Sequence, residues 1–368
     1  MSKRKKIVTL IAFCAFLSCI LLGCTNQVNA AGKAPSSFWV EYIDVGQGDS
    51  ALVQCDGHYL LIDGGPSDAS SVVYTVLKNK GITSIDYMIA THPDADHIGG
   101  LSGALNYARV KKCYCPVQSH DTKTFSNLEK NLKKQGIFFE IPEFGDEFQL
   151  GGAKVTILGP VLACSDTNNQ SIVTYITYGQ NTFLFAADAE LEEEETILRA
   201  WKNLDCDVLK VGHHGSDSST SNAFLKAVKP EYAVISVGKD NSYGHPTERT
   251  LKKLQDAGID LYRTDLQGDI VVSSDGKNLT FSTGKKVSKA DLYTGSVQSE
   301  NAGTVGTKEQ NEKAVNPGAY VLNINTKKFH NPSCSSVGDM NPKNRQDVTM
   351  SREEVINMGY VPCKRCHP

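Results

Sequence analysis

The densest group of chemically active side chains lies between residues 92 and 97. The segment THPDADHIGG, residues 91–100, places His92, Asp94, Asp96 and His97 directly after the strand-like run Tyr87–Ala90. Burying these four side chains side by side would be costly, whereas a divalent ion turns their crowding into ligation. The segment therefore predicts a metal site. A solvated loop that is rich in Asp and His by chance is the alternative interpretation.

Three further groups of acidic or imidazole side chains follow other strand-like runs. They are Asp188 after Thr182–Ala186, the pair His213 and His214 after Val208–Val211, and His245 after Tyr232–Val237. A single histidine is more often structural than ligating, but strand ends that converge at one sheet edge form binding sites. We therefore expect these side chains to join the metal site.

The elements that must position these side chains alternate regularly from residue 38 to residue 284. Short apolar runs typical of strands alternate with stretches of helical periodicity, such as Ala69–Lys80 and Thr247–Ala257. Early hairpins followed by alternating strands and helices indicate an α/β sandwich. The acidic run Glu192–Glu195 is expected to form the solvent-facing first turn of the helix Leu191–Ala200.

The chain opens with the features of an export signal. Basic residues at positions 3–6 precede an apolar stretch, Ile7–Leu22, which is short for a membrane span but suits a secretory signal. It ends in LLGC, residues 21–24, which resembles the bacterial lipobox and implies lipidation of Cys24. Residues 1–24 are thus expected to be a lipoprotein signal and 25–37 a tether. An ordinary signal peptide or a single-span anchor is the alternative, and in each case the remainder works outside the cytoplasm.

The composition excludes a general electrostatic attraction to nucleic acid. The chain carries a net charge of −3, which becomes more negative once the basic signal is removed. Any affinity for DNA must therefore come from a local patch or from a metal. Outside the cytoplasm disulfides are permitted, and the sequence leaves open how they would pair. The candidates in the main domain are Cys55, Cys113, Cys115, Cys164 and Cys206.

A change of composition separates the main domain from the C-terminus. Residues 285–317 hold hardly any large apolar side chain, which predicts a flexible linker. In residues 318–368 a Cys-x-x-Cys pair and two further soft ligands indicate a structural Zn²⁺, which stabilises a domain with too little core of its own. The expected ligands are His330, Cys334, Cys363 and Cys366. The alternatives are a disulfide from Cys334 to Cys363 or Cys366, and His367 as the fourth ligand.

Residues 38–285 resemble the metallo-β-lactamase superfamily, and in particular the extracellular hydrolase domain of the competence protein ComEC. The resemblance rests on segments in the right order: IDVGQGDS (43–50), LIDGG (61–65), HPDADHIGG (92–100), Asp188, HHGS (213–216) and YGHP (243–246). It implies a four-layer αββα sandwich with a metal site at one edge of the two sheets.

The resemblance also implies which residues bind metal. His92 and Asp94 would bind one divalent ion, Asp96 and His97 would bind a second, and Asp188 would bridge the two. Asp96 is in addition a candidate catalytic residue.

Further roles follow from the same resemblance. One of His213 and His214 would complete the ligand shell, and which of the two does so stays open. Asp63 would fix the main metal-binding loop by hydrogen bonds. Asp49 would likewise support the ligands from behind. The loop of residues 46–50 would line the substrate side together with His245, a candidate proton donor to the leaving group.

The chain departs from most of the superfamily at two positions, and the ComEC-like branch shares both departures. Asp94 stands where a histidine is usual, and no histidine lies between His120 and His213. These traits argue against a β-lactamase function. More carboxylate and less imidazole shifts the preference from Zn²⁺ toward Mn²⁺ or Mg²⁺, so Zn²⁺ and Mn²⁺ both remain candidates. His120 is an alternative ligand, although a surface-loop role is the stronger expectation.

The C-terminal segment resembles the zinc-binding, DNA-contacting module of the Ada DNA-repair protein, including the ending GYVPCKRC (359–366). In that family the first ligand is a cysteine that also accepts a methyl group. Here His330 takes its place, so the resemblance implies zinc binding without methyl transfer. Because the segment holds more basic than acidic residues, DNA is a candidate partner.

Together these features predict an extracytoplasmic ComEC-like phosphodiesterase or DNase with a two-metal site, attached to the membrane only through its lipid. One alternative is a hydrolase of another envelope ester, such as phosphorylcholine, a cyclic nucleotide or a lactone. The other is a lipid-anchored DNA-binding protein whose metal centre is structural.

Overall fold

The computed structural model describes residues 37–161, 166–295, 318–332, 334–338, 340–350, 355, 358, 360–363 and 366. The expected signal, the tether up to residue 36, Cys24 and Cys164 lie outside these residues, as does the linker from residue 296 to residue 317. Within the described part of the chain, no helix combines the length and the apolar character required to cross a membrane.

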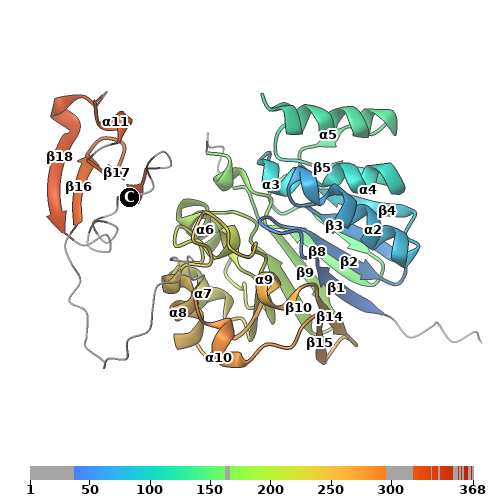
Figure 1. Ribbon diagram of the computed structural model, residues 1–368. Helices are drawn as coiled ribbons and strands as arrows, with labels where there is room; N and C mark the ends of the chain where they lie inside the picture. The colour runs from blue at the N-terminus through green and yellow to red at the C-terminus, as the bar shows by residue number, and fades with distance from the viewer. Residues whose placement is uncertain are drawn as a thin grey trace, which may run out of the picture.

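Two large sheets form the main domain (Figure 1). The first has the strand order β15-β14-β1-β2-β3-β4-β5-β6, and the second the order β13-β12-β11-β10-β9-β8-β7. The strands of the first sheet are β1 (Phe38–Tyr42), β2 (Ala51–Cys55), β3 (His58–Ile62), β4 (Ser84–Ile89), β5 (Arg109–Tyr114), β6 (Phe139–Glu140), β14 (Ile270–Ser274) and β15 (Leu279–Thr283). Those of the second are β7 (Glu147–Leu150), β8 (Ala153–Ile157), β9 (Thr174–Tyr178), β10 (Asn181–Phe185), β11 (Val208–Lys210), β12 (Tyr232–Ile235) and β13 (Asp260–Arg263).

Apolar side chains from both sheets fill the space between them. Because successive side chains of a strand point to opposite faces, Phe38 and Tyr42 of β1 share the inner face. The ring of Phe38 lies 5.0 Å from that of Phe183, and the ring of Tyr42 lies 5.7 Å from that of Phe185, both on β10. These buried contacts hold the two sheets face to face.

Helices cover the outer face of each sheet, which completes the four layers and confirms the predicted αββα sandwich (Figure 1). The first sheet is covered by α2 (Ser70–Lys80), α4 (Leu101–Tyr107) and α5 (Lys123–Lys134), and the second by α6 (Leu191–Ala200), α7 (Asn222–Val228) and α8 (Glu248–Asp256). The shorter helical elements are η1 (Ser67–Ala69), α3 (Ala95–Ile98), η2 (Asn168–Gln170), η3 (Gly212–Gly215), α9 (Thr264–Gln267) and α10 (Lys289–Leu292).

Parallel strands in each sheet direct their carboxyl ends toward one edge. In the first sheet β3, β4, β5 and β6 are parallel neighbours, and in the second β10, β11, β12 and β13 are. The segments that hold the predicted ligands closely follow β4, β10 and β11, and the loop that holds His245 follows β12. The strand order therefore explains how residues far apart in the sequence reach one site.

Two segments expected to face solvent are packed instead. Glu193 and Glu194 are buried whereas Glu192 and Glu195 are exposed, so the expectation of a solvent-facing acidic turn is wrong for two of its four residues. The reason is that Glu194 accepts the backbone N–H of Thr220 and of Ser221, which caps the start of α7. The linker was expected to begin at residue 285, but α10 follows, and its Leu292 is buried against the second sheet's helical layer.

A four-stranded sheet forms the C-terminal part, in the order β18-β16-β17-β19. Its elements are β16 (Gly318–Asn323), β17 (Lys328–His330), α11 (Ser335–Gly338), η4 (Pro342–Asn344), β18 (Arg345–Met350) and β19 (Val361–Pro362). A small core of Leu322, Phe329, Val355 and Tyr360 lies on it. No disulfide links the cysteines of the described residues.

Candidate metal centre

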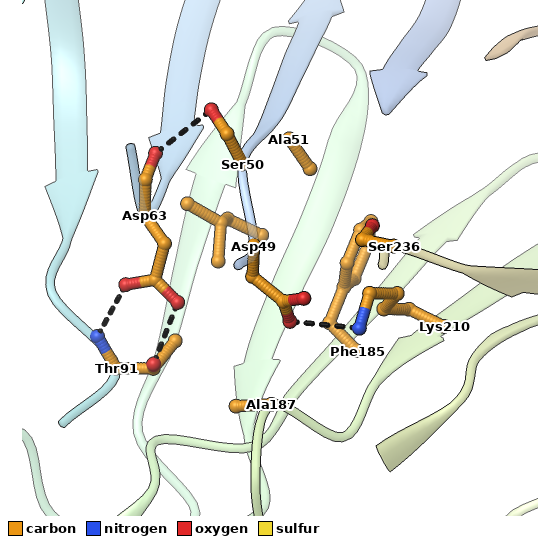
Figure 2. A pocket seen from close by; sticks show the side chains of 10 residues that line it. Asp49, Ser50, Ala51, Asp63, Thr91, Phe185, Ala187, Lys210 and Ser236 are labelled. Atoms are coloured by element: carbon orange, nitrogen blue, oxygen red, sulfur yellow. Dashed lines mark hydrogen bonds and ion pairs between the residues drawn. The ribbon is translucent and has the colours of Figure 1, made fainter. Parts of the chain in front are cut away.

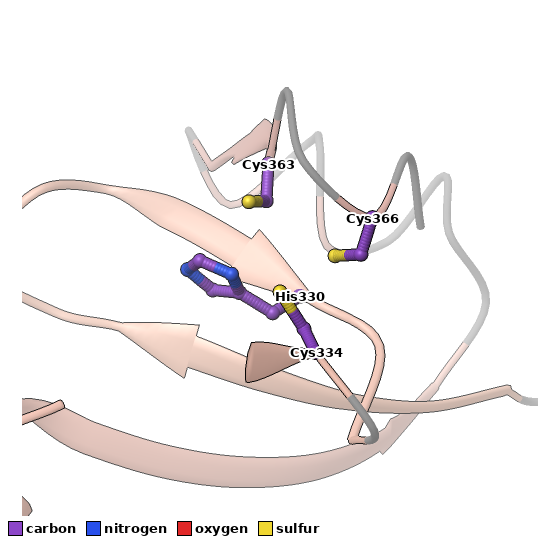
Figure 3. A group of neighbouring side chains, drawn as sticks. All are labelled: His330, Cys334, Cys363 and Cys366. Atoms are coloured by element: carbon purple, nitrogen blue, oxygen red, sulfur yellow. The ribbon is translucent and has the colours of Figure 1, made fainter. Parts of the chain in front are cut away.

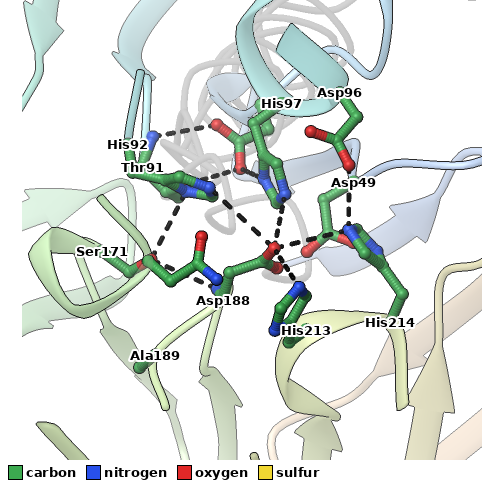
Figure 4. Close-up of polar contacts among 12 residues, drawn as sticks. Asp49, Thr91, His92, Asp96, His97, Ser171, Asp188, Ala189, His213 and His214 are labelled. Atoms are coloured by element: carbon green, nitrogen blue, oxygen red, sulfur yellow. Dashed lines mark hydrogen bonds and ion pairs between the residues drawn. The ribbon is translucent and has the colours of Figure 1, made fainter. Parts of the chain in front are cut away.

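One carboxylate oxygen lies at the centre of the imidazole cluster. Asp188 follows β10, and four histidines direct their Nε2 atoms toward its Oδ2 (Figure 4). The distances to this oxygen are 3.3 Å from His97, 3.6 Å from His213, 3.6 Å from His214 and 3.9 Å from His92. The ends of β4, β10 and β11 thus bring together residues that the sequence only suggested were related.

Three of these nitrogens have no hydrogen-bond partner among the described residues. The Nε2 atoms of His92, His97 and His214 are buried, as is the unpartnered Oδ1 of Asp188. A buried polar atom left without a partner costs about 1–3 kcal/mol, so several in one place point to a missing group. The donor set of imidazole nitrogen and carboxylate oxygen fits a divalent cation.

The other ring nitrogen of each of these histidines is anchored. Nδ1 of His92 lies 3.1 Å from the hydroxyl of Thr91, Nδ1 of His97 lies 2.8 Å from Oδ2 of Asp63, and Nδ1 of His214 lies 3.0 Å from the carbonyl oxygen of Ser236. Such bonds fix the ring and leave Nε2 as the free ligand atom, which is the usual arrangement around a metal.

Asp63 organises the loop after β4, the role that the sequence predicted for it (Figure 2). Its carboxylate accepts the backbone N–H of Thr91 at 2.9 Å, the Thr91 hydroxyl at 2.7 Å and the Nδ1–H of His97 at 2.8 Å. Asp63 has a φ of 56°, a left-handed conformation that aspartate tolerates better than most residues. The side chain is completely buried, so nothing competes with these bonds.

Asp49 and Lys210 form a buried ion pair beneath the cluster (Figure 2). The Lys210 Nζ lies 2.7 Å from Oδ2 of Asp49, and the other carboxylate oxygen lies 3.1 Å from Nδ1 of His214. Although burial raises it, the nearby Lys210 and His214 lower the pKa of Asp49 to about 2. Asp49 was expected to support the ligands from behind, and the structure places it behind His214.

The carboxylates and imidazoles of the cluster shift one another's pKa values. Although burial alone would lower it, Asp188 and Asp49 raise the pKa of His214 to about 10. Burial and the neighbouring His97 lower the pKa of His92 to about 4. Despite its burial, the adjacent histidines hold the pKa of Asp188 well below its usual range. The central carboxylate is therefore charged at neutral pH, the form that ligates a cation.

The turn after β11 presents both histidines of the pair. His213 and His214 have φ values of 47° and 53°, so two successive left-handed residues aim both rings at Asp188. His214 is buried and belongs to groups of potential ligand atoms with Asp96 and with Asp188, whereas His213 belongs to none. Nδ1 of His213 lies 3.1 Å from the hydroxyl of Ser218. The geometry thus favours His214 as the ligand of the pair.

The loops of the site approach one another closely enough to require glycine. A Cβ on Gly100 would collide with the carbonyl oxygen of Gly64, and one on Gly48 would collide with that of Asp96. These glycines let the segment around Asp49 and the segment around Asp63 lie directly against the Asp96–Gly100 backbone.

Sequence comparison agrees with the geometry of this cluster. The model of the Metallo-beta-lactamase superfamily matches residues 43–239, more than half of the chain. The chain belongs to the metallo-β-lactamase superfamily. Members of this superfamily bind divalent metals. A metal bound here would account for the unpartnered nitrogens around Asp188.

Two bacterial proteins are among the relatives of this superfamily member. The chain is 32% identical over 272 residues to ComE operon protein 3 of Bacillus subtilis, covering 69% of the chain and 35% of that protein. It is 32% identical over 236 residues to competence protein ComA of Neisseria gonorrhoeae, covering 61% and 30%. The chain thus spans about a third of the length of these relatives. The solved structure of YhfI, a metallo-beta-lactamase fold protein of Bacillus subtilis, matches with 15% identity and a TM-score of 0.45 over 65% of the chain and 100% of YhfI.

Two residues of the main superfamily motif occupy different places around the cluster. Asp96 lies with its Oδ2 3.4 Å from Nε2 of His214, in a group of potential ligand atoms with His97 and His214. Asp94 precedes α3 and is absent from every such group. His120 lies apart, with its Nδ1 3.3 Å from the Thr122 hydroxyl.

His245 stands beside the cluster rather than in it. Its ring lies 5.5 Å from that of His213, and the exposed Tyr243 ring stacks on its other side at 5.9 Å. Burial and the nearby His213 and His214 lower the pKa of His245 to about 4, so it is uncharged at neutral pH. Its Nδ1 is buried without a partner among the described residues. This position fits the substrate side expected from the sequence.

Sequence reasoning missed several residues that the site uses. Lys210 lies within an apolar strand, where a lysine carries no signal of function until its partner is known. The Ser171 hydroxyl accepts the backbone N–H of Asp188 at 3.2 Å and lies 3.4 Å from Nδ1 of His92. Ser171 is completely buried and reaches the site just before β9. A lone serine in the sequence gives no indication of such a role.

The predicted C-terminal ligands form a second cluster (Figure 3). Ligand atoms of His330, Cys334, Cys363 and Cys366 all lie within 4.8 Å of one another. Nδ1 of His330 is buried without a partner among the described residues, and the backbone N–H of Asn331 donates to Sγ of Cys366 at 3.4 Å. The set of one nitrogen and three sulfur atoms fits tetrahedral Zn²⁺. His367 lies outside the described residues.

Proposed function

We propose that the chain is a metal-dependent phosphodiesterase that cleaves DNA outside the cytoplasm, with two divalent ions in its main site. The observation that carries the proposal is the convergence of buried, partnerless imidazole nitrogens from both sheets on one oxygen of Asp188. Similarity to a protein named for competence, ComA of Neisseria gonorrhoeae, supports DNA as the polymer. The chain covers only about a third of each of the two relatives described above, so DNA is our proposal for this chain and is not carried over from them.

Two overlapping groups of ligand atoms suit two ions. One consists of His92, His97 and Asp188, and the other of Asp96, His97 and His214. Because a ring nitrogen binds a single ion, His97 would serve one of the two ions. Divalent ions held there would supply Lewis acidity toward the phosphoryl oxygens and lower the pKa of a bound water. The mixture of carboxylate and imidazole suits Mn²⁺ as well as Zn²⁺.

The protein's own residues hold and orient this site. Asp63 and Asp49 fix the rings of His97 and His214 from behind, so that each presents its Nε2 atom. His245, with an unpartnered Nδ1 beside the cluster, contacts the leaving oxygen of the substrate. An uncharged imidazole there donates or accepts a hydrogen bond according to its tautomer.

The proposal is tested with the full chain purified in detergent. DNA and bis-p-nitrophenyl phosphate are incubated with Mn²⁺, Mg²⁺ or Zn²⁺, for the wild type, His92→Ala and the control His120→Ala, which changes a histidine outside the cluster. We expect metal-dependent cleavage of DNA that His92→Ala loses and His120→Ala keeps. If only the small diester is turned over, the proposed substrate changes from DNA to another phosphoester of the cell envelope. If neither compound is cleaved, the proposed phosphodiesterase activity is refuted.

We further propose that the C-terminal cluster binds one structural Zn²⁺ and that this module contacts DNA. Four ligand atoms within 4.8 Å of one another support the metal. The basic side chains of the segment support a polyanionic partner. Metal analysis of the full chain should give one Zn²⁺ that survives loss of the main site in His92→Ala.

We also propose that Cys24 carries lipid and anchors the protein to the outer face of the cell membrane. The proposal rests on the LLGC segment that follows the apolar stretch. Labelling of growing cells with radioactive palmitate should mark the wild type, whereas a Cys24→Ala variant should stay unlabelled. If the Cys24→Ala variant were still labelled, Cys24 would not be the lipidated residue and this proposal would be refuted.

A further inference from the structure

A groove of about 510 Å³ runs between α7 and α8, on the outer layer of the second sheet. Its lining residues are Asn222, Leu225, Lys226, Arg249, Lys252, Lys253, Asp256 and Ala257. Four of them are basic and one is acidic, in a chain whose overall charge is −3. The groove is therefore a local positive surface on an acidic protein, the kind of patch that the composition required for any affinity to DNA.

Most of this positive charge is not neutralised within the described structure. Lys226 and Arg249 are exposed, and neither forms an ion pair with another described residue. Lys252 pairs with Asp256 at 3.1 Å. Lys253 donates to the carbonyl oxygens of Ser219 at 3.1 Å and Thr220 at 2.7 Å, which fixes its position. Fixed and unpaired cations side by side favour the binding of an anion that bridges them.

The groove begins where the loops of the metal centre end. Helix α7 starts shortly after the turn of His213 and His214, and α8 starts three residues after His245. Two bonds tie the start of α8 to that turn, since Thr247 N–H donates to the Gly215 carbonyl at 3.0 Å and the Thr250 hydroxyl donates to that of Ser216 at 3.0 Å. Both helices that line the groove thus start from loops that carry residues of the metal centre.

We propose that the α7–α8 groove binds the phosphates of the nucleic-acid strand that flank the scissile bond. This inference rests on the proposed nuclease function, and it adds a binding surface for the polymer substrate beside the metal centre. Helix α8 has nine residues and is about 14 Å long at 1.5 Å per residue, which matches roughly four nucleotides at 3.4 Å each. The lining holds no aromatic side chain for base stacking, so its contacts are to phosphates, which carry no sequence information.

The test compares two double variants of the full chain. Lys226→Glu with Arg249→Glu reverses charge in the groove, and Lys130→Glu with Lys134→Glu reverses two exposed lysines of α5, on the other sheet. Cleavage of DNA and of bis-p-nitrophenyl phosphate is measured at several salt concentrations. We expect kcat/KM for DNA to fall at least tenfold in the groove variant alone, with turnover of the small diester unchanged. The slope of log kcat/KM against log salt should become shallower by about 1.5, for two lost phosphate contacts.

Binding separates failure of this inference from failure of the proposed function. A fluorescent 20-nucleotide strand is titrated into each double variant carrying in addition His92→Ala, which disables the metal centre. Weaker binding by the groove variant than by the α5 variant supports the groove even where no DNA is cleaved. Equal binding of the strand by both variants would overturn the inference. So would a groove variant that binds the strand normally and loses only its binding to phosphatidylglycerol vesicles, measured in parallel.

Discussion

Replacing Asp63 by asparagine isolates the contribution of its charge to the metal centre. Asparagine keeps the shape and tolerates the φ of 56° at this position. The amide oxygen still accepts the Thr91 N–H, and the amide NH2 can donate to the Thr91 hydroxyl, which still accepts from Nδ1–H of His92, 3.1 Å away. The bond that cannot be replaced is the one from Nδ1–H of His97, at 2.8 Å.

The expected cost follows from that single bond. A hydrogen bond to a charged group contributes about 1.5–3 kcal/mol, which lowers Tm by roughly 3–12 °C in a domain of this size. Because the bond also orients His97, loss of a supporting carboxylate should weaken metal affinity by about 10- to 100-fold. Free Mn²⁺ is measured by its electron paramagnetic resonance signal during titration, since the thiolate-rich C-terminal cluster prefers Zn²⁺.

The control is Asp86→Asn, which removes a charge from a carboxylate that bonds Lys111 and the Tyr59 N–H, outside the cluster. It should lower Tm without a change in Mn²⁺ affinity. Wild-type Mn²⁺ affinity in Asp63→Asn would refute the reasoning, because the orientation of His97 would then not depend on this carboxylate.

Three further predictions concern other parts of the molecule. Lys210→Met leaves the buried Asp49 carboxylate without its ammonium and should cost about 3–5 kcal/mol in urea unfolding, whereas combining it with Asp49→Asn should recover most of the loss. Burial and the nearby Arg249 lower the pKa of Lys253 to about 8, so between about pH 8 and 10.4 the unfolded chain binds more protons there. The free energy of unfolding of the wild type should therefore rise with pH across that window relative to Lys253→Met. Removal of Zn²⁺ by Cys363→Ser should be visible in metal analysis and should unfold the C-terminal sheet, as followed by the amide signals of β16.

Much of the candidate site could be predicted because metal ligands belong to a few residue types that rarely cluster by chance. His92, His97 and Asp188 each directly follow or closely follow an apolar strand, and parallel strands place such positions at one edge. The sequence could not distinguish His213 from His214, because the choice depends on two left-handed backbone conformations.

The features that sequence reasoning missed depend on distant partners. Glu194 looks like a surface acid until the N–H groups of Thr220 and Ser221 are placed against it. Lys210 looks anomalous in an apolar strand until Asp49 arrives from the other sheet. The helix α10 has too few apolar residues to be predicted, since it is held largely by Leu292 and by the carbonyl groups that Arg263 binds.

The ligands of the main centre come from both halves of the sandwich. His92 and His97 follow a strand of the first sheet, while Asp188 and His214 follow strands of the second. An ion shared by these residues is a cross-link between the two sheets, so its binding energy becomes folding energy for the whole domain. At a free-ion concentration of about 100 times Kd this linkage adds roughly 2.7 kcal/mol. The lifetime of the folded domain against proteases should then rise with the concentration of that ion.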